Sequence, residues 1–169
     1  TTLNGTYGIG KTVSIQIIST EDITVDVSGG TPTLTLETGS SDASVDYFSG
    51  SGSFVSSFIY TVLSGHTSPD LAYESTSALS LNGGSMNDIA GNPLTLTLIT
   101  PGESNSLSAN KNIIIDAVAP SAFTVGAVSS TGNTVVSNYW NSTNTGIDVI
   151  VPVASDTSLT GGTIQLRAN

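Results

Sequence analysis

Residues 11–39 have the sequence KTVSIQIISTEDITVDVSGGTPTLTLETG. Apolar and polar side chains alternate in three runs within this stretch, at 13–17, 23–27 and 34–36. Alternation with a period of two places successive side chains on opposite faces of a strand, so each run predicts a half-buried antiparallel strand. Residues 28–32 (SGGTP) separate the last two runs, because glycine and proline favour turns. The stretch therefore predicts an all-β fold.

The same pattern continues over the next eighty residues. Further alternating runs lie at 45–47, 54–63, 79–81, 94–98 and 113–115. In the longest of them, Phe54, Phe58, Tyr60 and Val62 are expected to share the inward face. Short strands separated by frequent turns predict an immunoglobulin-like β-sandwich. Residues 68–80 fit either a helical turn or an irregular strand that crosses between sheets.

A domain boundary is expected at residues 116–120 (DAVAP). The strand pattern ends at Ile115 and starts again at Phe123, and an Ala-Pro step suits a short, stiff connector. We therefore predict one immunoglobulin-like sandwich at 1–118 and the start of a second, partial module at 119–169. A partial module leaves apolar strand edges open, and is stable only if something completes it.

The charge balance excludes several classes of partner. The chain of 169 residues has 13 acidic and 3 basic side chains, for a net charge of −10. Lys11, Lys111 and Arg167 cannot form the basic patch that a nucleic acid needs. No apolar run approaches the roughly 20 residues that cross a bilayer, so no membrane insertion is expected. Cysteine is absent, which suits an extracellular module but equally a cytosolic one.

Several short motifs occur in an order typical of one family. They include residues 5–10 (GTYGIG), 32–36 (PTLTL), 47–52 (YFSGSG), 75–79 (STSAL), 81–84 (LNGG) and 88–92 (DIAGN), followed by 110–111 (NK) and 115–116 (ID). Together, over roughly residues 5–120, they resemble the bacterial immunoglobulin-like repeats of large tandem-repeat surface proteins and adhesins. Residues 119–169 resemble the opening of a related repeat.

The resemblance implies a structural or adhesive module, acting as a spacer or stalk on the bacterial cell surface, with neighbouring repeats as its first partners. Two alternatives belong to other classes. The module could itself recognise a glycan or a host protein, or it could be a filament subunit that assembles with other copies by strand donation. An enzyme is not expected, because His66 is the only histidine, it falls in a turn, and no Gly-x-Ser-x-Gly motif is present.

Calcium is the one cofactor that the sequence suggests. Asp116 lies at the connector, Asp88 lies in a turn, and Glu21 and Asp22 follow the first alternating run. Carboxylate oxygens are the ligands that calcium prefers, and tandem extracellular modules often hold this ion near their connectors. The alternative is that these carboxylates are solvated and satisfy local backbone donors.

Tyr139 and Trp140 form the candidate ligand-binding pair. They lie beside asparagine and serine in an expected loop, where an exposed tryptophan could stack on a sugar ring. The alternative is a buried tryptophan of the sandwich core. Exposure of Trp140 distinguishes the two.

Overall fold

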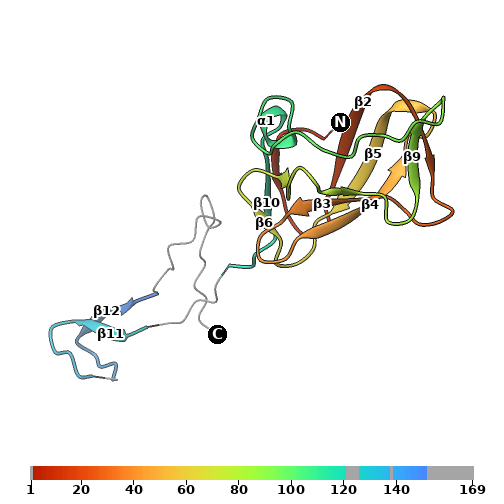
Figure 1. Ribbon diagram of the computed structural model, residues 1–169. Coiled ribbons are helices and arrows are strands. Elements are labelled where there is room, and N and C mark those ends of the chain that lie inside the picture. The colour runs from red at the N-terminus through yellow and green to blue at the C-terminus, as the bar shows by residue number, and fades with distance from the viewer. Residues whose placement is uncertain (1, 121–125, 138, 152–169) are drawn as a thin grey trace. The chain divides into compact units, whose positions relative to one another are not determined.

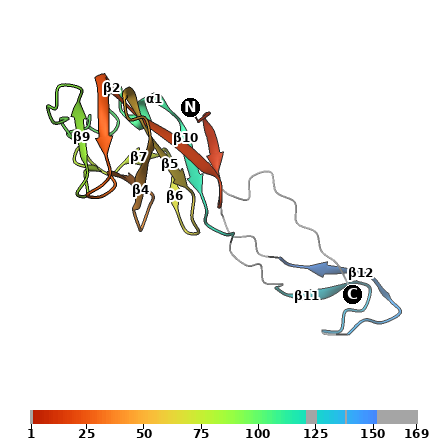
Figure 2. The same ribbon diagram turned by 90° about the vertical axis from the view of Figure 1, so that its right-hand side faces the viewer.

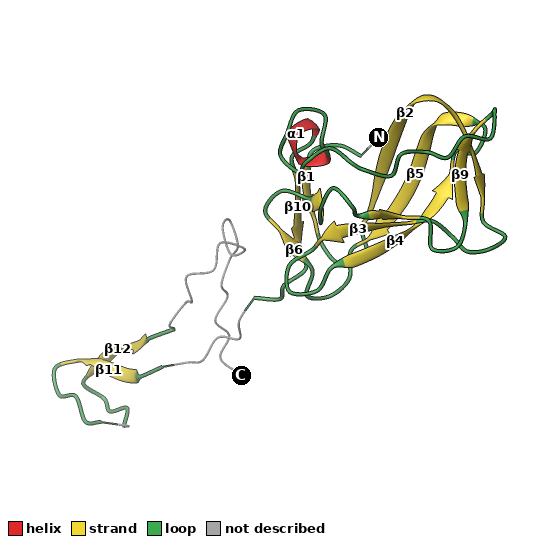
Figure 3. Ribbon diagram, viewed as in Figure 1, coloured by secondary structure: helices red, strands yellow, loops and turns green. Residues whose placement is uncertain are grey.

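A computed structural model describes residues 2–120, 126–137 and 139–151. The chain divides into two compact units, Thr1–Val118 and Ala119–Asn169. Strands dominate the described residues of the first unit, and α1 (Leu107–Asn110) is the only helix in the described ranges (Figure 3). No helix within those ranges is long and apolar enough to cross a membrane. The prediction of an all-β fold is confirmed.

The larger sheet of the first unit is antiparallel and strongly curled (Figure 1). Its strand order is β7–β3–β4–β5–β2–β9, with β8 paired to β3. The strands are β2 (Thr12–Asp26), β3 (Thr33–Glu37), β4 (Ala43–Ser49), β5 (Ser53–Thr61), β7 (Ala72–Tyr73), β8 (Leu79–Ser80) and β9 (Ser85–Asp88). Because the sheet curls, its two ends face each other and enclose a core, as in an all-β sandwich.

A second, three-stranded sheet closes the unit. It has the order β1–β10–β6, with β1 (Gly5–Tyr7), β6 (Thr67–Ser68) and β10 (Ile113–Asp116). β10 pairs antiparallel with β6 but parallel with β1, where Gly5 lies opposite Ile113 and Tyr7 opposite Ile115. The first and last strands of the unit are therefore hydrogen-bonded neighbours that point the same way.

β2 is a single strand of 15 residues that joins the first two predicted runs. It lies between β5 and β9, but β9 borders only its second half, from Ile23 to Asp26 (Figure 2). The pairing of β2 with β5 shifts between Ile18 and Ile23. The buried positions of β2 are nevertheless odd-numbered on both sides of this bulge, at Val13, Ile15 and Ile23.

The prediction for Phe54 is wrong. Phe58, Tyr60 and Val62 are buried as expected, whereas Phe54 is 51% exposed. Phe54 lies between Val55, which pairs with Ile18, and Ser53, which pairs with Ile23, so it lies opposite the bulge of β2. Its ring lines an open hollow beside Glu21 and Asp22 instead of the core.

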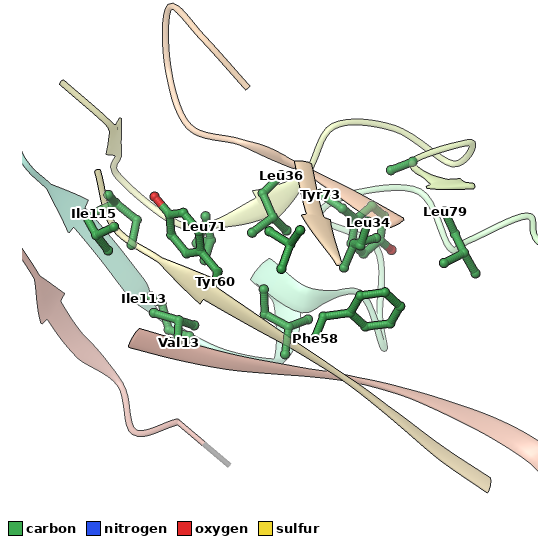
Figure 4. Close-up of a cluster of buried hydrophobic side chains, with 14 of the residues drawn as sticks. Val13, Leu34, Leu36, Phe58, Tyr60, Leu71, Tyr73, Leu79, Ile113 and Ile115 are labelled. Atoms are coloured by element: carbon green, nitrogen blue, oxygen red, sulfur yellow. The ribbon is translucent and has the colours of Figure 1, made fainter. Parts of the chain in front are cut away.

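The core fills the space inside the curled sheet (Figure 4). Its members are mostly the inward-facing residues of the alternating runs, together with residues of the short strands. The buried cluster consists of Val13, Ile15, Leu34, Leu36, Val45, Phe58, Tyr60, Val62, Leu71, Tyr73, Ala78, Leu79, Ile113, Ile115 and Ala117. Aliphatic side chains dominate, and Tyr47 meets Phe58 edge to face with ring centroids 6.0 Å apart.

Two segments differ from simple strand expectations. Residues 68–80 contain β7 and β8 but no helix, so the irregular crossing is the correct alternative for them. Residues 94–98 belong to no strand, although the buried sides of Leu96 and Leu98 pack against the core. The single helical turn is α1, which begins after Ser106, whose side chain accepts a hydrogen bond from the Ala109 N–H.

Two glycine turns cross in direct main-chain contact. A Cβ built on Gly30 would lie 1.8 Å from the Asn82 carbonyl oxygen, and one on Gly84 would lie 2.3 Å from the Gly30 oxygen. Gly30 also has a φ of +156°. Side chains are excluded at this crossing, which fixes the turn before β3 against the turn before β9.

The described part of the second unit is a two-stranded antiparallel ribbon. β11 (Val128–Gly132) pairs with β12 (Asn144–Val149), from Val128 opposite Val149 to Gly132 opposite Asn144.

Candidate functional site

The acidic residues proposed as calcium ligands lie at two separate ends of the first unit. Glu21 and Asp22 are exposed on the bulge of β2. They line one side of an open hollow of about 680 Å³, together with Phe54, Ile89 and Ala90. The hollow thus combines two carboxylates with an apolar floor, at the end of the unit away from the connector.

Asp88 lies at the end of β9, where its main chain pairs with Ile23. Its carboxylate closes a turn, because Oδ1 accepts a hydrogen bond from the Asn92 N–H at 2.7 Å and Oδ2 accepts one from the Asn92 side chain at 2.7 Å. The Asn92 side chain, followed by the main-chain donors, holds the pKa of Asp88 below its usual value. Local turn formation therefore accounts for this residue without an ion.

Asp116 ends β10 and pairs with Thr67, at the connector end of the unit. Its Oδ1 accepts a hydrogen bond from the Val118 N–H at 3.4 Å. Between the two ends of the unit runs β2, whose regularly paired residues 12–18 alone span roughly 20 Å at the usual rise per residue. Asp116 cannot share one ion with Glu21 or Asp22. The described residues contain no group of three acidic, histidine or cysteine side chains able to hold a metal, so calcium binding stays a prediction.

His66 is half-buried rather than a solvated turn residue. Its Nδ1 lies 2.8 Å from the Tyr60 hydroxyl, and the two rings stack with centroids 5.8 Å apart. Burial raises the pKa of Tyr60 to about 12. The main chain of His66 accepts a hydrogen bond from the Ala117 N–H, so this pair anchors the exit of the chain from the unit.

Tyr139 and Trp140 are both exposed, at 72% and 57%. The loop that carries them is ordered by asparagine side chains: Asn141 donates to the Thr134 carbonyl at 2.8 Å, and the Asn141 N–H donates to Asn144 at 2.7 Å. Exposure of both rings favours the ligand-binding interpretation over the core interpretation.

Sequence reasoning missed an apolar groove in the first unit. A groove of about 670 Å³ lies between the first half of β2 and residues 94–99, with Leu34, Tyr73 and Leu79 at its base. The sequence signal for this groove was the alternation of leucines at 94–98. This alternation predicted a strand, but it could not show that the segment pairs with no neighbouring strand. The N-terminus lies at one end of this groove, near α1 (Figure 1).

No family model, curated protein or solved structure matches this chain. The resemblance to bacterial immunoglobulin-like repeats stays a prediction from sequence.

Proposed function

We propose that the chain is a structural module of a bacterial extracellular surface protein, in which it acts as a spacer or stalk of an adhesin. Three observations support this proposal. The order of motifs over residues 5–120 resembles such repeats, two β units follow each other along one chain, and the composition is strongly acidic. The role is mechanical, with strand pairing and an aliphatic core providing the stability.

The parallel pairing of β1 with β10 carries the proposal. Tension on a stalk acts through the N-terminal end of β1 and the C-terminal end of β10. Because the strands are parallel, these points lie at opposite ends of the pair, from Gly5–Ile113 to Tyr7–Ile115. Pulling therefore shears the ladder and loads its hydrogen bonds together, whereas an antiparallel pair would open one bond at a time.

Single-molecule stretching of the full chain tests this role. One attachment point is the N-terminus. Because the chain has no cysteine, a single introduced thiol defines the other. Ala119→Cys lies after β10 and applies shear. Asn110→Cys lies before β10 and peels the same two strands apart, and both positions are exposed. We expect the shear geometry to require a several-fold higher unfolding force, and equal forces would refute a load-bearing role.

A second candidate function is recognition of a glycan through Tyr139 and Trp140, which their exposure favours. Aromatic faces that remain in contact with water can stack on sugar rings. A glycan array probed with the full chain tests this function, with Trp140→Ala as the disabling variant and Trp140→Tyr as the conservative one. We expect binding that survives only in the conservative variant. If the chain binds no glycan on the array, the spacer role is the one proposed function that remains.

A further inference from the structure

Three segments of the first unit meet at Ile23, a buried residue of β2. On one side Ile23 pairs with β5, at the residue before Phe54, and on the other side it pairs with β9, at the residue before Ile89. Both pairs are antiparallel, so the residue that precedes Ile23 faces the residues that follow its two partners. The strand register therefore brings Asp22 beside Phe54 and Ile89, and all three line the open hollow at the bulge of β2.

The apolar part of this hollow is open to water and fixed in place. Phe54 is half exposed and Ile89 is largely exposed. The turn that carries Ile89 is closed by Asp88, whose carboxylate accepts two hydrogen bonds from Asn92 and whose N–H donates to the Asn92 carbonyl at 2.9 Å. Apolar side chains that stand together in water, rimmed by polar groups, are typical of surfaces that bind another protein.

The charged part of the hollow has no counterpart in the first unit. Glu21 and Asp22 are exposed there, and the unit contains two basic side chains, Lys11 and Lys111. The Lys111 Nζ donates to the Thr2 carbonyl at 3.2 Å. Lys11 precedes β2, and the regularly paired part of that strand, roughly 20 Å long, separates it from the hollow. A cation that meets both carboxylates must therefore come from outside the unit.

An aromatic ring beside two carboxylates suits an arginine side chain. The apolar stem of arginine covers apolar surface, while its planar cation stacks on aromatic rings and donates paired hydrogen bonds to carboxylates. Lysine has a compact, strongly hydrated charge without a planar face, so it uses less of this surface.

We propose that the hollow is a docking site for a basic, arginine-containing segment of a partner protein. The guanidinium lies between Glu21 and Asp22, and its stem packs against Phe54 and Ile89. Charge complementarity selects this occupant. A second copy of the chain brings a net charge of −10 and the same two carboxylates, and nucleic acids and anionic membranes are negative as well. The site goes beyond the spacer role, because it gives the end of the unit away from the connector a partner of its own.

NMR titration of the full chain at physiological ionic strength tests the proposal. The probe is a short capped peptide with two arginines separated by glycines, and its control carries citrulline, which keeps the shape of arginine without the charge. We expect the arginine peptide to shift the amides of residues 19–22, 53–55 and 88–91 in a saturable way, and the citrulline peptide to leave them unchanged. Absence of saturable shifts, or equal shifts with both peptides, would overturn the proposal.

Two double variants separate a specific site from general attraction to an acidic chain. Glu21→Gln with Asp22→Asn removes both carboxylates of the hollow and should weaken binding of the arginine peptide by about tenfold. The matched control, Glu103→Gln with Asp46→Asn, removes the same charge from two exposed side chains outside the hollow. It should change the affinity by less than about twofold, because salt screens distant charges. Equal weakening by the two variants would overturn the proposal.

Phe54→Leu tests the aromatic contribution. Leucine keeps an apolar side chain but has no ring face, so we expect binding of the arginine peptide to weaken by about threefold. Unchanged affinity would contradict the proposed position of the guanidinium stem and head. The hollow takes no part in the pairing of β1 with β10, so the stretching experiment can fail while this proposal holds, and the reverse is also true.

Discussion

Phe54 and Phe58 offer a direct test of the bulge in β2. Both are phenylalanines on β5, four residues apart, and simple alternation would place both in the core. The structure instead leaves Phe58 at 0% exposure, against the ring of Tyr47, and Phe54 at 51% exposure. Replacing each by alanine removes the same atoms from two different environments.

The expected costs differ about fourfold. Phe58→Ala removes a fully buried ring and leaves a cavity, which costs about 3–5 kcal/mol in protein cores. Part of that cost is the edge-to-face contact with Tyr47, for which about 0.5–1.5 kcal/mol is typical. Phe54 keeps half of its surface in water, so Phe54→Ala loses about half of the roughly 2 kcal/mol that full burial of such a ring provides. We therefore expect about 4 kcal/mol against about 1 kcal/mol.

Urea unfolding followed by far-UV circular dichroism measures both costs. With a slope of about 2 kcal/mol per molar urea, the midpoint should fall by about 2 M for Phe58→Ala and by about 0.5 M for Phe54→Ala. Equal midpoint shifts would show that Phe54 is buried as fully as Phe58.

Three further predictions concern the first unit. Gly30→Ala should lower the free energy of unfolding by about 2–3 kcal/mol, because the added Cβ would overlap the Asn82 carbonyl. Gly52→Asn should lower it by less than about 1 kcal/mol, because open space surrounds Gly52. Thermal unfolding compares the two variants, and similar costs would contradict the main-chain crossing at Gly30. Folding raises the pKa of Tyr60 from 10.0 to about 12, so the stability that its neutral form provides is complete below pH 10 and is lost as the pH rises through about 12. Between neutral and alkaline pH, Tyr60→Phe should therefore lose less of its stability than the parent chain loses. An unchanged alkaline profile would be evidence against burial of the hydroxyl. Hydrogen bonds lower the pKa of Asp88, so the stability that its ionised form provides is present above pH 3.8 and is lost as the pH falls through the lower pKa of the folded state. Asn92→Ala should return this pKa toward 3.8, as measured by NMR titration of the carboxyl group. No change in the pKa would mean that Asn92 does not close this turn.

Local patterns predicted the strands whose partners lie close in sequence. The alternation in residues 11–39 identified β2 and β3, and the buried positions Val13, Ile15, Leu34 and Leu36 follow from it directly. A period of two is a property of each strand alone, so it can be recognised without knowing the neighbours.

Features that depend on distant partners could not be predicted in this way. The exposure of Phe54 follows from the register of β5 against a bulge in another strand, and the absence of a ladder at 94–98 follows from the course of the sheet. The same limit applies to the candidate sites. Proximity to a turn or a connector in the sequence suggested four calcium ligands, Glu21, Asp22, Asp88 and Asp116. The path of β2 in the structure shows that Glu21 and Asp22 lie far from Asp116. The exposure of Trp140 likewise depends on packing that composition does not encode.

The pairing of β1 with β10 also governs when the first unit can fold. Asn112 and Asn4, which adjoin these strands, are 108 residues apart and hydrogen-bonded. A chain that emerges from its N-terminus must keep β1 unpaired until nearly the whole unit has been made, whereas neighbours such as β3 and β4 can meet early. High contact order of this kind slows folding and delays its last step. The unit therefore becomes complete only when β10 arrives, and β1 lacks its partner strand up to that moment.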